Sequence, residues 1–298
     1  MIIVALGASL VMLLWAVCYP LIVLSMPYAP LMQTAFLRAL LGGLFLLLCA
    51  LVLRRPFPRS LHAWVAITAI GLTATTIGFW GMFYAGSLIS PGLATVLTNT
   101  QPLIASVLAG IILKEVIHRK VLVGILIGFS GISIIGLNGA LEHNAQTVYG
   151  VIYVICAALG IAISNILLKK VAKRIDIFYA MGGQLVIGSL PLLALAPSLE
   201  TFPVLFVNLN YIVILTTLAI PGTALPFLLW YWLMDKAPLN QLNVFSFLTP
   251  IFGLALGWVY FSESLLLWQW VGVVVVFVAI VLSILPGIER SQADSRAR

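Results

Sequence analysis

Ten apolar runs, most of them close to the ~20 residues that a membrane-spanning helix needs, dominate this 298-residue sequence. They cover residues 2–24, 30–53, 61–85, 91–113, 121–137, 148–168, 178–195, 211–234, 239–261 and 266–285. Because 63% of the residues are hydrophobic and only 8% are charged, almost no chain is left for a water-soluble domain. The sequence therefore predicts an all-α integral membrane protein with ten transmembrane helices.

The basic residues give these helices a direction. When the connections are assigned alternately to two faces, 14 of the 15 Lys and Arg residues fall on one face, and Glu142, Glu200 and Glu263 fall on the other. The positive-inside rule makes the basic face cytoplasmic. Skipping one helix would exchange the faces of every later connection, so the separation supports the count of ten. We expect a multi-pass protein of the inner membrane with both termini cytoplasmic and a disordered tail over residues 289–298.

The two halves of the chain are related to each other. Residues 95–137 align without a gap with residues 243–285, at an offset of 148 and with nine identical positions in 43, Pro102 with Pro250 and Glu115 with Glu263 among them. Since each half holds five spans, an odd number, the second half must cross the membrane in the opposite sense. The sequence predicts a 5+5 inverted-topology repeat, with residues 1–145 and 146–288 as its halves. Such repeats are typical of secondary transporters.

Short motifs in both halves resemble those of the EamA-type members of the drug/metabolite transporter superfamily. The motifs are Leu14-Trp15, Phe36-Leu37-Arg38, Asn99-Thr100-Gln101-Pro102, Leu113-Lys114-Glu115, Leu248-Thr249-Pro250 and Phe261-Ser262-Glu263. The resemblance implies a 5+5 inverted repeat around a central cavity that binds small metabolites, often for export. Where the family commonly has Trp-Gly in the first span, this chain has Trp15-Ala16.

Polar residues in spans four and nine are candidates for substrate binding. They are Thr98, Asn99 and Gln101 in the first half and Asn243, Ser246 and Thr249 in the second. In hydrocarbon such groups need partners, so they either join helices or line a water-filled cavity. We predict that they line the cavity. Asn165 and Gln184 are equally polar but less well placed.

Aromatic residues recur at helical spacing in the spans that would surround a cavity. The candidates are Trp15, Tyr19, Trp80, Tyr84, Phe227 and Trp230. A wall of aromatic rings with polar edges suits an amphipathic or aromatic solute. The alternative is an aromatic belt at the membrane interface, to which Tyr84 and Trp230 would belong.

Arg38 is the only formally charged residue well inside a span. A charged group at that depth suggests function, and a guanidinium can bind a substrate carboxylate. The resemblance favours the alternative of a structural clamp, because an arginine is common here in members with different substrates. One arginine cannot neutralise a phosphate ester, so multiply charged substrates are disfavoured.

Prolines inside spans suggest gates. A proline removes a backbone hydrogen bond and bends the helix. Pro102 and Pro250 are equivalent at the 148-residue offset, and Pro226 lies opposite Gly78. We predict that spans three and four form one gate and that spans eight and nine form the other; the alternative is that the bends only shape the packing.

These features predict a secondary transporter that moves small neutral or zwitterionic metabolites, such as amino acids, by alternating access, as an exporter or exchanger. No Asp, Glu, His or Lys lies deep in a span, which disfavours proton coupling. The alternatives are a multidrug efflux carrier for amphipathic compounds and, from another class, a non-transporting assembly protein.

Other functions find little support in the residues. An intramembrane enzyme would need a buried nucleophile, general base or metal site, which the spans do not offer. The three cysteines lack the spacing of a metal site, so we expect neither metal nor cofactor. The formal charge of +7 is explained by basic residues that orient the helices in the membrane rather than by nucleic-acid binding.

The expected partners are the lipid bilayer and a small-molecule substrate. We expect a monomer or a weak homodimer, the latter through Gly124-x-x-x-Gly128.

Overall fold

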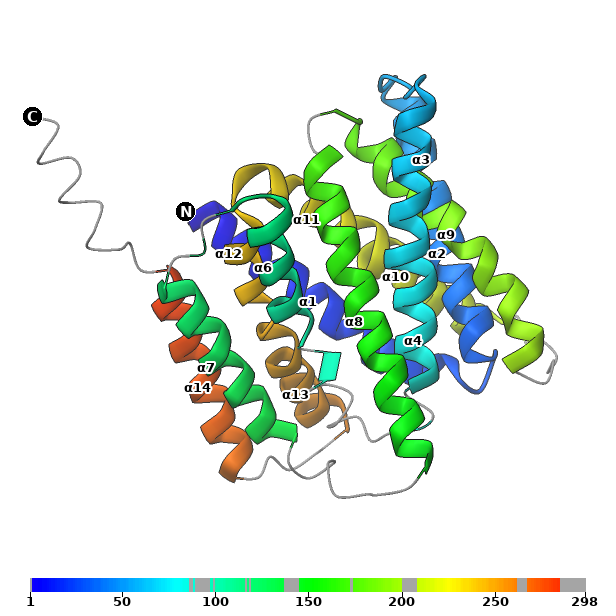
Figure 1. The fold of residues 1–298 in the computed structure, drawn as a ribbon. Helices are drawn as coiled ribbons and strands as arrows, with labels where there is room; N and C mark the ends of the chain where they lie inside the picture. The colour runs from blue at the N-terminus through cyan, green and yellow to red at the C-terminus, as the bar shows by residue number, and fades with distance from the viewer. Residues whose placement is uncertain are drawn as a thin grey trace, which may run out of the picture.

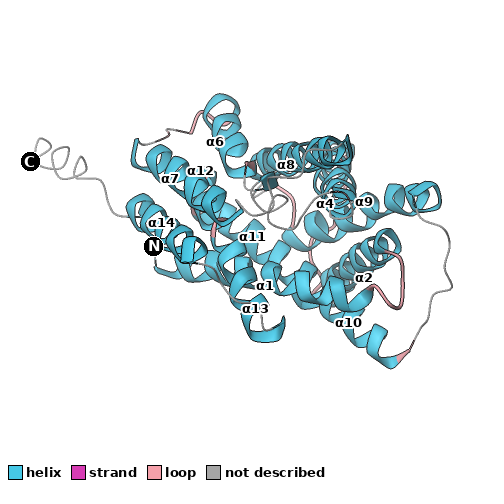
Figure 2. Cartoon of the chain, turned by 90° about the horizontal axis from the view of Figure 1, so that it is seen from below, coloured by secondary structure: helices cyan, strands magenta, loops and turns pink. Residues whose placement is uncertain are grey.

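The computed structural model describes residues 2–85, 88, 97–98, 100–115, 117, 119–136, 145–171, 174–199, 208–261 and 267–284. The residues so described form helices joined by short connections, without a strand (Figures 1 and 2), which confirms the predicted all-α class. Six helical stretches within them are long and apolar enough to cross a membrane. These are Ile2–Ile22, Leu31–Val52, Leu61–Ala85, Val148–Val171, Ile177–Leu195 and Leu209–Lys236.

The helices fall on the apolar runs of the sequence. The first half contains α1 (Ile2–Ser25), α2 (Leu31–Val52), α3 (Leu61–Ile70), η1 (Gly71–Ile77), α4 (Gly78–Ala85), α6 (Gln101–Ile112) and α7 (Arg119–Gly136). The second half contains α8 (Ala145–Val171), α9 (Ile177–Leu199), α10 (Leu209–Ala219), η3 (Ile220–Ala224), α11 (Leu225–Lys236), α12 (Leu239–Phe245), α13 (Leu248–Phe261) and α14 (Leu267–Ile284).

Two of the runs contain a π-helical segment. η1 joins α3 to α4, and η3 joins α10 to α11, at matching places under the 148-residue offset. A π turn holds more residues than an α turn, is rare, and occurs frequently at functional sites. The starts of these two runs also match. Ser60 Oγ accepts a hydrogen bond from the Ala63 N–H (3.2 Å), and Asn208 Oδ1 accepts one from the Tyr211 N–H (2.8 Å).

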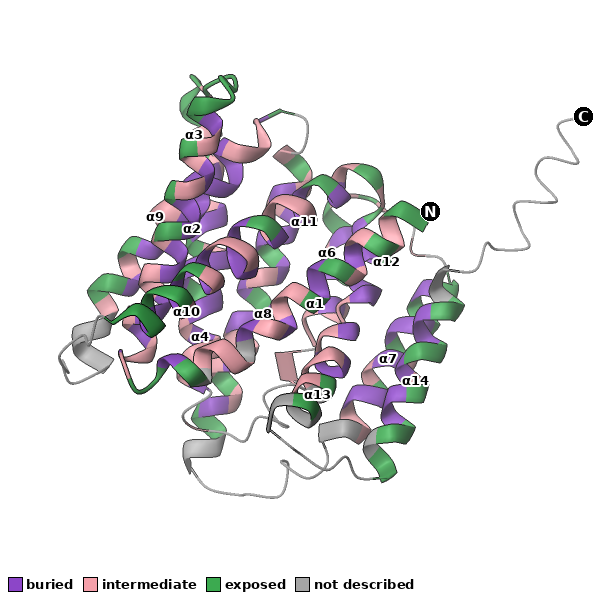
Figure 3. Ribbon diagram, turned by 180° about the vertical axis from the view of Figure 1, so that it is seen from behind, coloured by how far each residue is buried: buried purple, intermediate pink, exposed green. Residues whose placement is uncertain are grey.

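The helices pack most extensively in two pairs, α7 with α14 and α2 with α9. Figure 1 shows α7 and α14 side by side at one edge of the molecule. α1 packs against α13 and α11, while α8 packs against α6 and α4. Many apolar residues are exposed, Leu48, Val65 and Val274 among them. Figure 3 shows exposed residues along the outer helices, α9 and α14 among them. An apolar exterior of this kind suits contact with lipid.

Small residues set the spacing of α2 and α9. A Cβ built on Gly43 would lie 2.9 Å from the carbonyl oxygen of Gly182, and one on Gly182 would lie 3.0 Å from the carbonyl oxygen of Gly43. Lipid tails are as apolar as leucine, so helices in a membrane associate through close packing of small residues rather than through the hydrophobic effect. The pair of glycines provides that close packing here.

Connections that carry basic residues meet at one end of the bundle. Arg55 Nε lies 3.9 Å from Asp176 Oδ2, which joins the α2–α3 connection to the α8–α9 connection. The Tyr231 hydroxyl, near the end of α11, donates to the carbonyl oxygens of Val171 (3.2 Å) and Ile175 (3.3 Å). These contacts place the ends of α2, α8 and α11 side by side.

Two further contacts extend this end to α12 and α6. Lys169 Nζ donates to the carbonyl oxygens of Met234 and Ala237, the latter at 2.6 Å. The Glu115 carboxylate accepts from the first two backbone N–H groups of α12, at 3.1 and 3.3 Å. A carboxylate is stabilised there because the first N–H groups of a helix lack partners inside the helix. Four connections that the charge pattern assigned to one face are thus neighbours.

Candidate functional site

An aromatic cluster joins α1 to α11. The Trp15 ring centroid lies 5.9 Å from that of Phe227 and 5.8 Å from that of Trp230. Trp230 is only 4% exposed, and its indole N–H donates to Asn165 Oδ1 of α8 at 3.2 Å. The structure therefore brings together three predicted site residues and adds Asn165, which the sequence analysis ranked lower. Trp230 is therefore packed inside the protein, and its indole N–H already has a protein partner.

A second aromatic cluster joins α4 to α8. Tyr153 stands edge-on to both predicted aromatic residues of α4, with ring centroids 4.9 Å from Trp80 and 4.8 Å from Tyr84. The Trp80 indole N–H is buried and has no hydrogen-bond partner among the described residues. A buried N–H without a partner is costly, so this group is available to a ligand.

Arg38 of α2 is held by protein groups. It is 6% exposed, and its Nε donates to Thr223 Oγ1 of η3 at 3.2 Å. Its guanidinium carbon lies 4.7 Å from the ring centroid of Phe79 and 5.8 Å from that of Phe83, both on α4. These are cation–π distances. The side chain therefore links α2, α4 and η3.

A related contact joins η1 to α9. Thr75 Oγ1 donates to Gln184 Oε1 at 2.8 Å, and both residues are fully buried. The Gln184 amide nitrogen has no partner within the described part of the chain. Neither Thr75 nor Thr223 was predicted from the sequence, although their separation of 148 residues is a signal that could have found them.

Asn243 of α12 has a buried amide that the protein leaves unused. It is 1% exposed, and neither Oδ1 nor Nδ2 has a partner among the residues described. Its backbone carbonyl accepts from Ser246 Oγ at 2.5 Å. Thr249 turns toward α1, where its hydroxyl lies 3.1 Å from Met12 Sδ. Of the three polar residues predicted in span nine, Asn243 is the one whose side chain can bind a ligand without first losing a protein partner.

Other predicted residues lie at the start of α6 or outside the described residues. Gln101 begins α6, Thr98 precedes it, and both are half-buried. Asn99, the tail and Glu263 lie outside the residues described, as does the side chain of Tyr19.

Two of the predicted gating residues, Pro102 and Pro250, lie in the first turns of helices, whereas Pro226 and Gly78 lie inside continuous helical stretches, just after π segments. Pro102 is the second residue of α6, Pro226 the second of α11 and Pro250 the third of α13, and Gly78 begins α4. A proline in the first turn removes no intrahelical hydrogen bond. Pro102 and Pro250 therefore do not interrupt a helix, whereas Pro226 follows the π segment η3 inside the stretch Leu209–Lys236. The ninth run is interrupted before Pro250 by a turn at residues 246–247, and the eighth changes from α to π geometry at η3, just before Pro226. The gating role of these residues stays a prediction.

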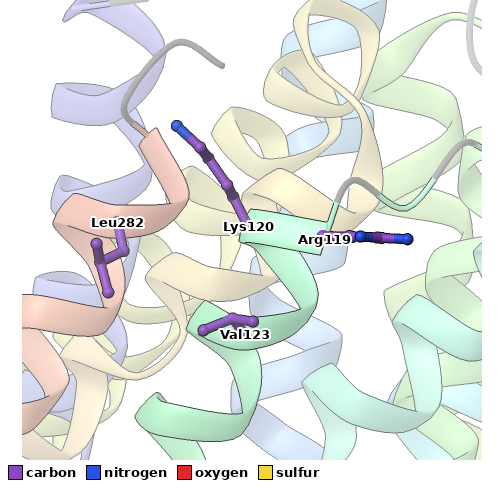
Figure 4. A pocket seen from close by; sticks show the side chains of 4 residues that line it. All are labelled: Arg119, Lys120, Val123 and Leu282. Carbon is purple, nitrogen blue, oxygen red and sulfur yellow. The ribbon is translucent and has the colours of Figure 1, made fainter. Parts of the chain in front are cut away.

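A groove of about 200 Å³ opens elsewhere, between the start of α7 and the end of α14. Figure 4 shows the residues that line it, Arg119, Lys120, Val123 and Leu282. It contains none of the predicted substrate-binding residues, so it does not belong to the site described above.

Within the described residues, no cluster of three or more His, Cys, Asp or Glu side chains could hold a metal ion.

Known proteins are similar to this chain in sequence. Both halves match the EamA-like transporter family, over residues 2–137 and 148–285. An uncharacterised transporter of Synechocystis sp. is 30% identical over 263 residues, which cover 83% of this chain and 79% of that protein. A chloroplastic WAT1-related protein of Arabidopsis thaliana is 31% identical over 262 residues, which cover 85% of this chain and 62% of that protein.

A crystal structure of another protein shares the fold. It superposes with a TM-score of 0.82 at 17% identity and covers 95% of this chain and 98% of its own. At this identity the similarity concerns the fold alone.

Proposed function

Because the chain belongs to the EamA-like transporter family and is therefore a multi-pass membrane transporter, we propose that it carries small neutral or zwitterionic metabolites, such as amino acids, by alternating access. The family predicted from short motifs is confirmed, and its members are transporters rather than enzymes. The observation that carries the proposed substrate class is a set of buried, neutral hydrogen-bonding groups without protein partners, the Asn243 amide and the Trp80 indole N–H. Neutral donors and acceptors suit a solute with little net charge.

We assign the substrate site to the aromatic cluster that joins the two halves together with the unpartnered amide of Asn243. Trp15, Phe227 and Trp230 supply rings, and Asn243 supplies an amide that can both donate and accept. Because none of the eight Asp and Glu residues lies deep in a span, export occurs by exchange or facilitated diffusion rather than through a buried titrating carboxylate.

The proposed mechanism needs two equivalent halves, and several contacts support an inverted repeat of five helices each. The packing of α1 on α13 and α11 has a counterpart in that of α8 on α6 and α4. The caps Ser60 and Asn208 and the segments η1 and η3 also match at the same offset. We therefore propose halves over residues 1–145 and 146–288, with both termini on the cytoplasmic side of the inner membrane.

This topology predicts opposite exposure of two equivalent residues, His62 and Asn210. Both are exposed and lie near the starts of α3 and α10. In a chain freed of its three cysteines, we expect His62→Cys to react with an impermeant maleimide only from the cytoplasmic side and Asn210→Cys only from the outside. Labelling of intact and of permeabilised cells measures this. Reaction of both from one side would refute the inverted repeat.

The function is tested with purified protein in liposomes. We expect at least one labelled amino acid or related zwitterion to equilibrate at least tenfold faster than in protein-free vesicles, with faster efflux when unlabelled solute is present outside. A Trp15→Ala variant serves as control, because loss of the ring that contacts both Phe227 and Trp230 lowers the rate without preventing insertion. If no member of a neutral and zwitterionic panel equilibrates, the proposed substrate class is wrong and a non-transporting assembly role gains support.

The ring cluster also favours a second candidate, efflux of amphipathic aromatic compounds. Three large rings in contact offer stacking surface that a small aliphatic metabolite would not need. Competition in the same liposomes separates the two candidates, because only a multidrug carrier is inhibited by structurally unrelated hydrophobic compounds.

We propose that the working unit is a monomer. A Cβ built on Gly128 would lie 2.5 Å from the Phe247 ring of the same chain, so this glycine of the predicted dimer motif packs internally. This contact supports an intramolecular use of Gly124-x-x-x-Gly128.

A further inference from the structure

Two buried polar contacts cross between the halves at the π turns. In one, Arg38 of α2 in the first half donates from Nε to Thr223 Oγ1 of η3 in the second half, at 3.2 Å. In the other, Gln184 of α9 in the second half accepts from Thr75 Oγ1 of η1 in the first half, at 2.8 Å. Each π turn is therefore held by a polar side chain from the opposite half.

The surroundings of the two contacts correspond. One turn after Gln184, a Cβ built on Gly188 would lie 2.6 Å from Thr75 Cβ. One turn after Arg38, a Cβ built on Gly42 would lie 3.6 Å from Thr223 Cβ. Gln184 therefore occupies in α9 the place that Arg38 occupies in α2. An alignment of the two halves at an offset of 148 residues does not show this equivalence, because it pairs Arg38 with Val186.

A π turn determines how the following helix is rotated. Moving from a π turn to an α turn removes about one residue from the turn, which rotates the downstream helix by about 100°. α4, which follows η1, carries Trp80, and α11, which follows η3, carries Phe227 and Trp230. Any contact that fixes the register of a π turn thus fixes the direction of these aromatic side chains.

Thr223 also takes part in the local structure of its own turn. Thr223 Oγ1 also donates to the carbonyl oxygen of Leu218, five residues earlier, at 2.8 Å. That spacing is the hydrogen-bond spacing of a π turn. At η1, the Gln184 amide nitrogen has no partner among the described residues, so this contact leaves one buried donor unsatisfied. An unsatisfied donor favours a rearrangement that would give it a partner.

We propose that Arg38 and Gln184 are a matched pair of positioning residues. Each holds the π turn of the opposite half in register and thereby orients the aromatic residues that line the proposed substrate site; neither binds the substrate. The guanidinium of Arg38 already has protein partners, Thr223 and the ring of Phe79. This inference rests on the proposed function for the identity of the site, but the contacts themselves can be tested without a transported solute.

Hydrogen exchange of the protein in lipid nanodiscs tests whether the two threonine hydroxyls hold the π turns; at η3 this hydroxyl bonds both Arg38 and Leu218. Valine has the shape of threonine without the hydroxyl. We expect Thr223→Val to speed exchange of the amides of Ile220–Ala224 about tenfold and Thr75→Val to do the same for Gly71–Ile77, each without affecting the other turn. Thr217→Val is the matched control, because the Thr217 hydroxyl bonds only the carbonyl of Val213 in its own helix among the described residues. Unchanged exchange in both π turns, or an increase spread evenly over all helices, overturns the proposal.

Transport kinetics distinguish positioning from substrate contact. We expect Arg38→Gln, which places at this position the residue found at its counterpart, to lower the maximal rate at least fivefold while KM changes less than twofold. The reduction should be equal for a carboxylate-bearing solute and its amide. A tenfold rise in KM confined to the carboxylate would identify Arg38 as a substrate ligand and overturn the proposal. If the wild-type protein transports nothing, the proposed function fails. Hydrogen exchange still shows whether the threonine contacts hold the π turns, because that measurement needs no transported solute.

Discussion

Replacing Gly188 by valine is expected to destroy the native packing of the bundle. A Cβ at this position would lie 2.4 Å from the carbonyl oxygen of Gly71 and 2.6 Å from Thr75 Cβ. Overpacking typically costs ~1–3 kcal/mol, and this clash is with backbone, which cannot rotate away, so we expect about 3 kcal/mol or more. Thermal unfolding of detergent-purified protein measures the loss, and we expect most of the variant to elute as aggregate on gel filtration.

The matched control for this prediction is Gly253→Val. A Cβ on Gly253 meets no atom of the described residues within 4 Å, so only the difference in helix propensity acts; it slightly favours valine over glycine, and the expected change stays below ~1 kcal/mol. A Gly188→Val variant that elutes and melts like the control would mean that α9 and η1 are not in backbone contact.

Replacing Asn243 by leucine is expected to abolish transport and to stabilise the fold. Both polar atoms of this 1% exposed side chain lack partners in the described residues, and a buried unsatisfied polar group costs ~1–3 kcal/mol. Leucine has nearly the same volume and no polar group, so the melting temperature should rise. If the amide binds the solute, transport should fall to less than a tenth. The two effects have opposite signs, which separates loss of a binding group from loss of structure.

The control on the same helix is Gln241→Leu. Gln241 is exposed, two residues from Asn243, so its replacement should leave the transport rate within about twofold of wild type. Retained transport in Asn243→Leu would remove this residue from the substrate site. A fall in the melting temperature would show that its amide has a structural partner.

The sequence predicted some features of the site and missed others for a definite reason. Trp15 and Trp230 stood out because large aromatic residues in membrane spans are conspicuous, and the structure places them in contact. Asn165 and Gln184 ranked low because nothing in the local sequence says that one lies beside Trp230 and the other beside Thr75. The positions of the prolines were visible in the sequence, but their surroundings were not: Pro250 follows a turn at residues 246–247, and Pro226 follows a π segment inside a continuous helical stretch.

The sequence by itself determined that this chain belongs in a membrane, where its helices lie and which family it joins. These properties follow from sums over local residues, since about 20 apolar residues in succession carry enough transfer free energy to place a helix in lipid. Only the tertiary structure decided which polar groups meet across the halves and where π turns replace α turns. In lipid all faces of an apolar helix are nearly equivalent, so partners are chosen by close packing of small residues such as Gly188 and by single buried hydrogen bonds such as that of Arg38.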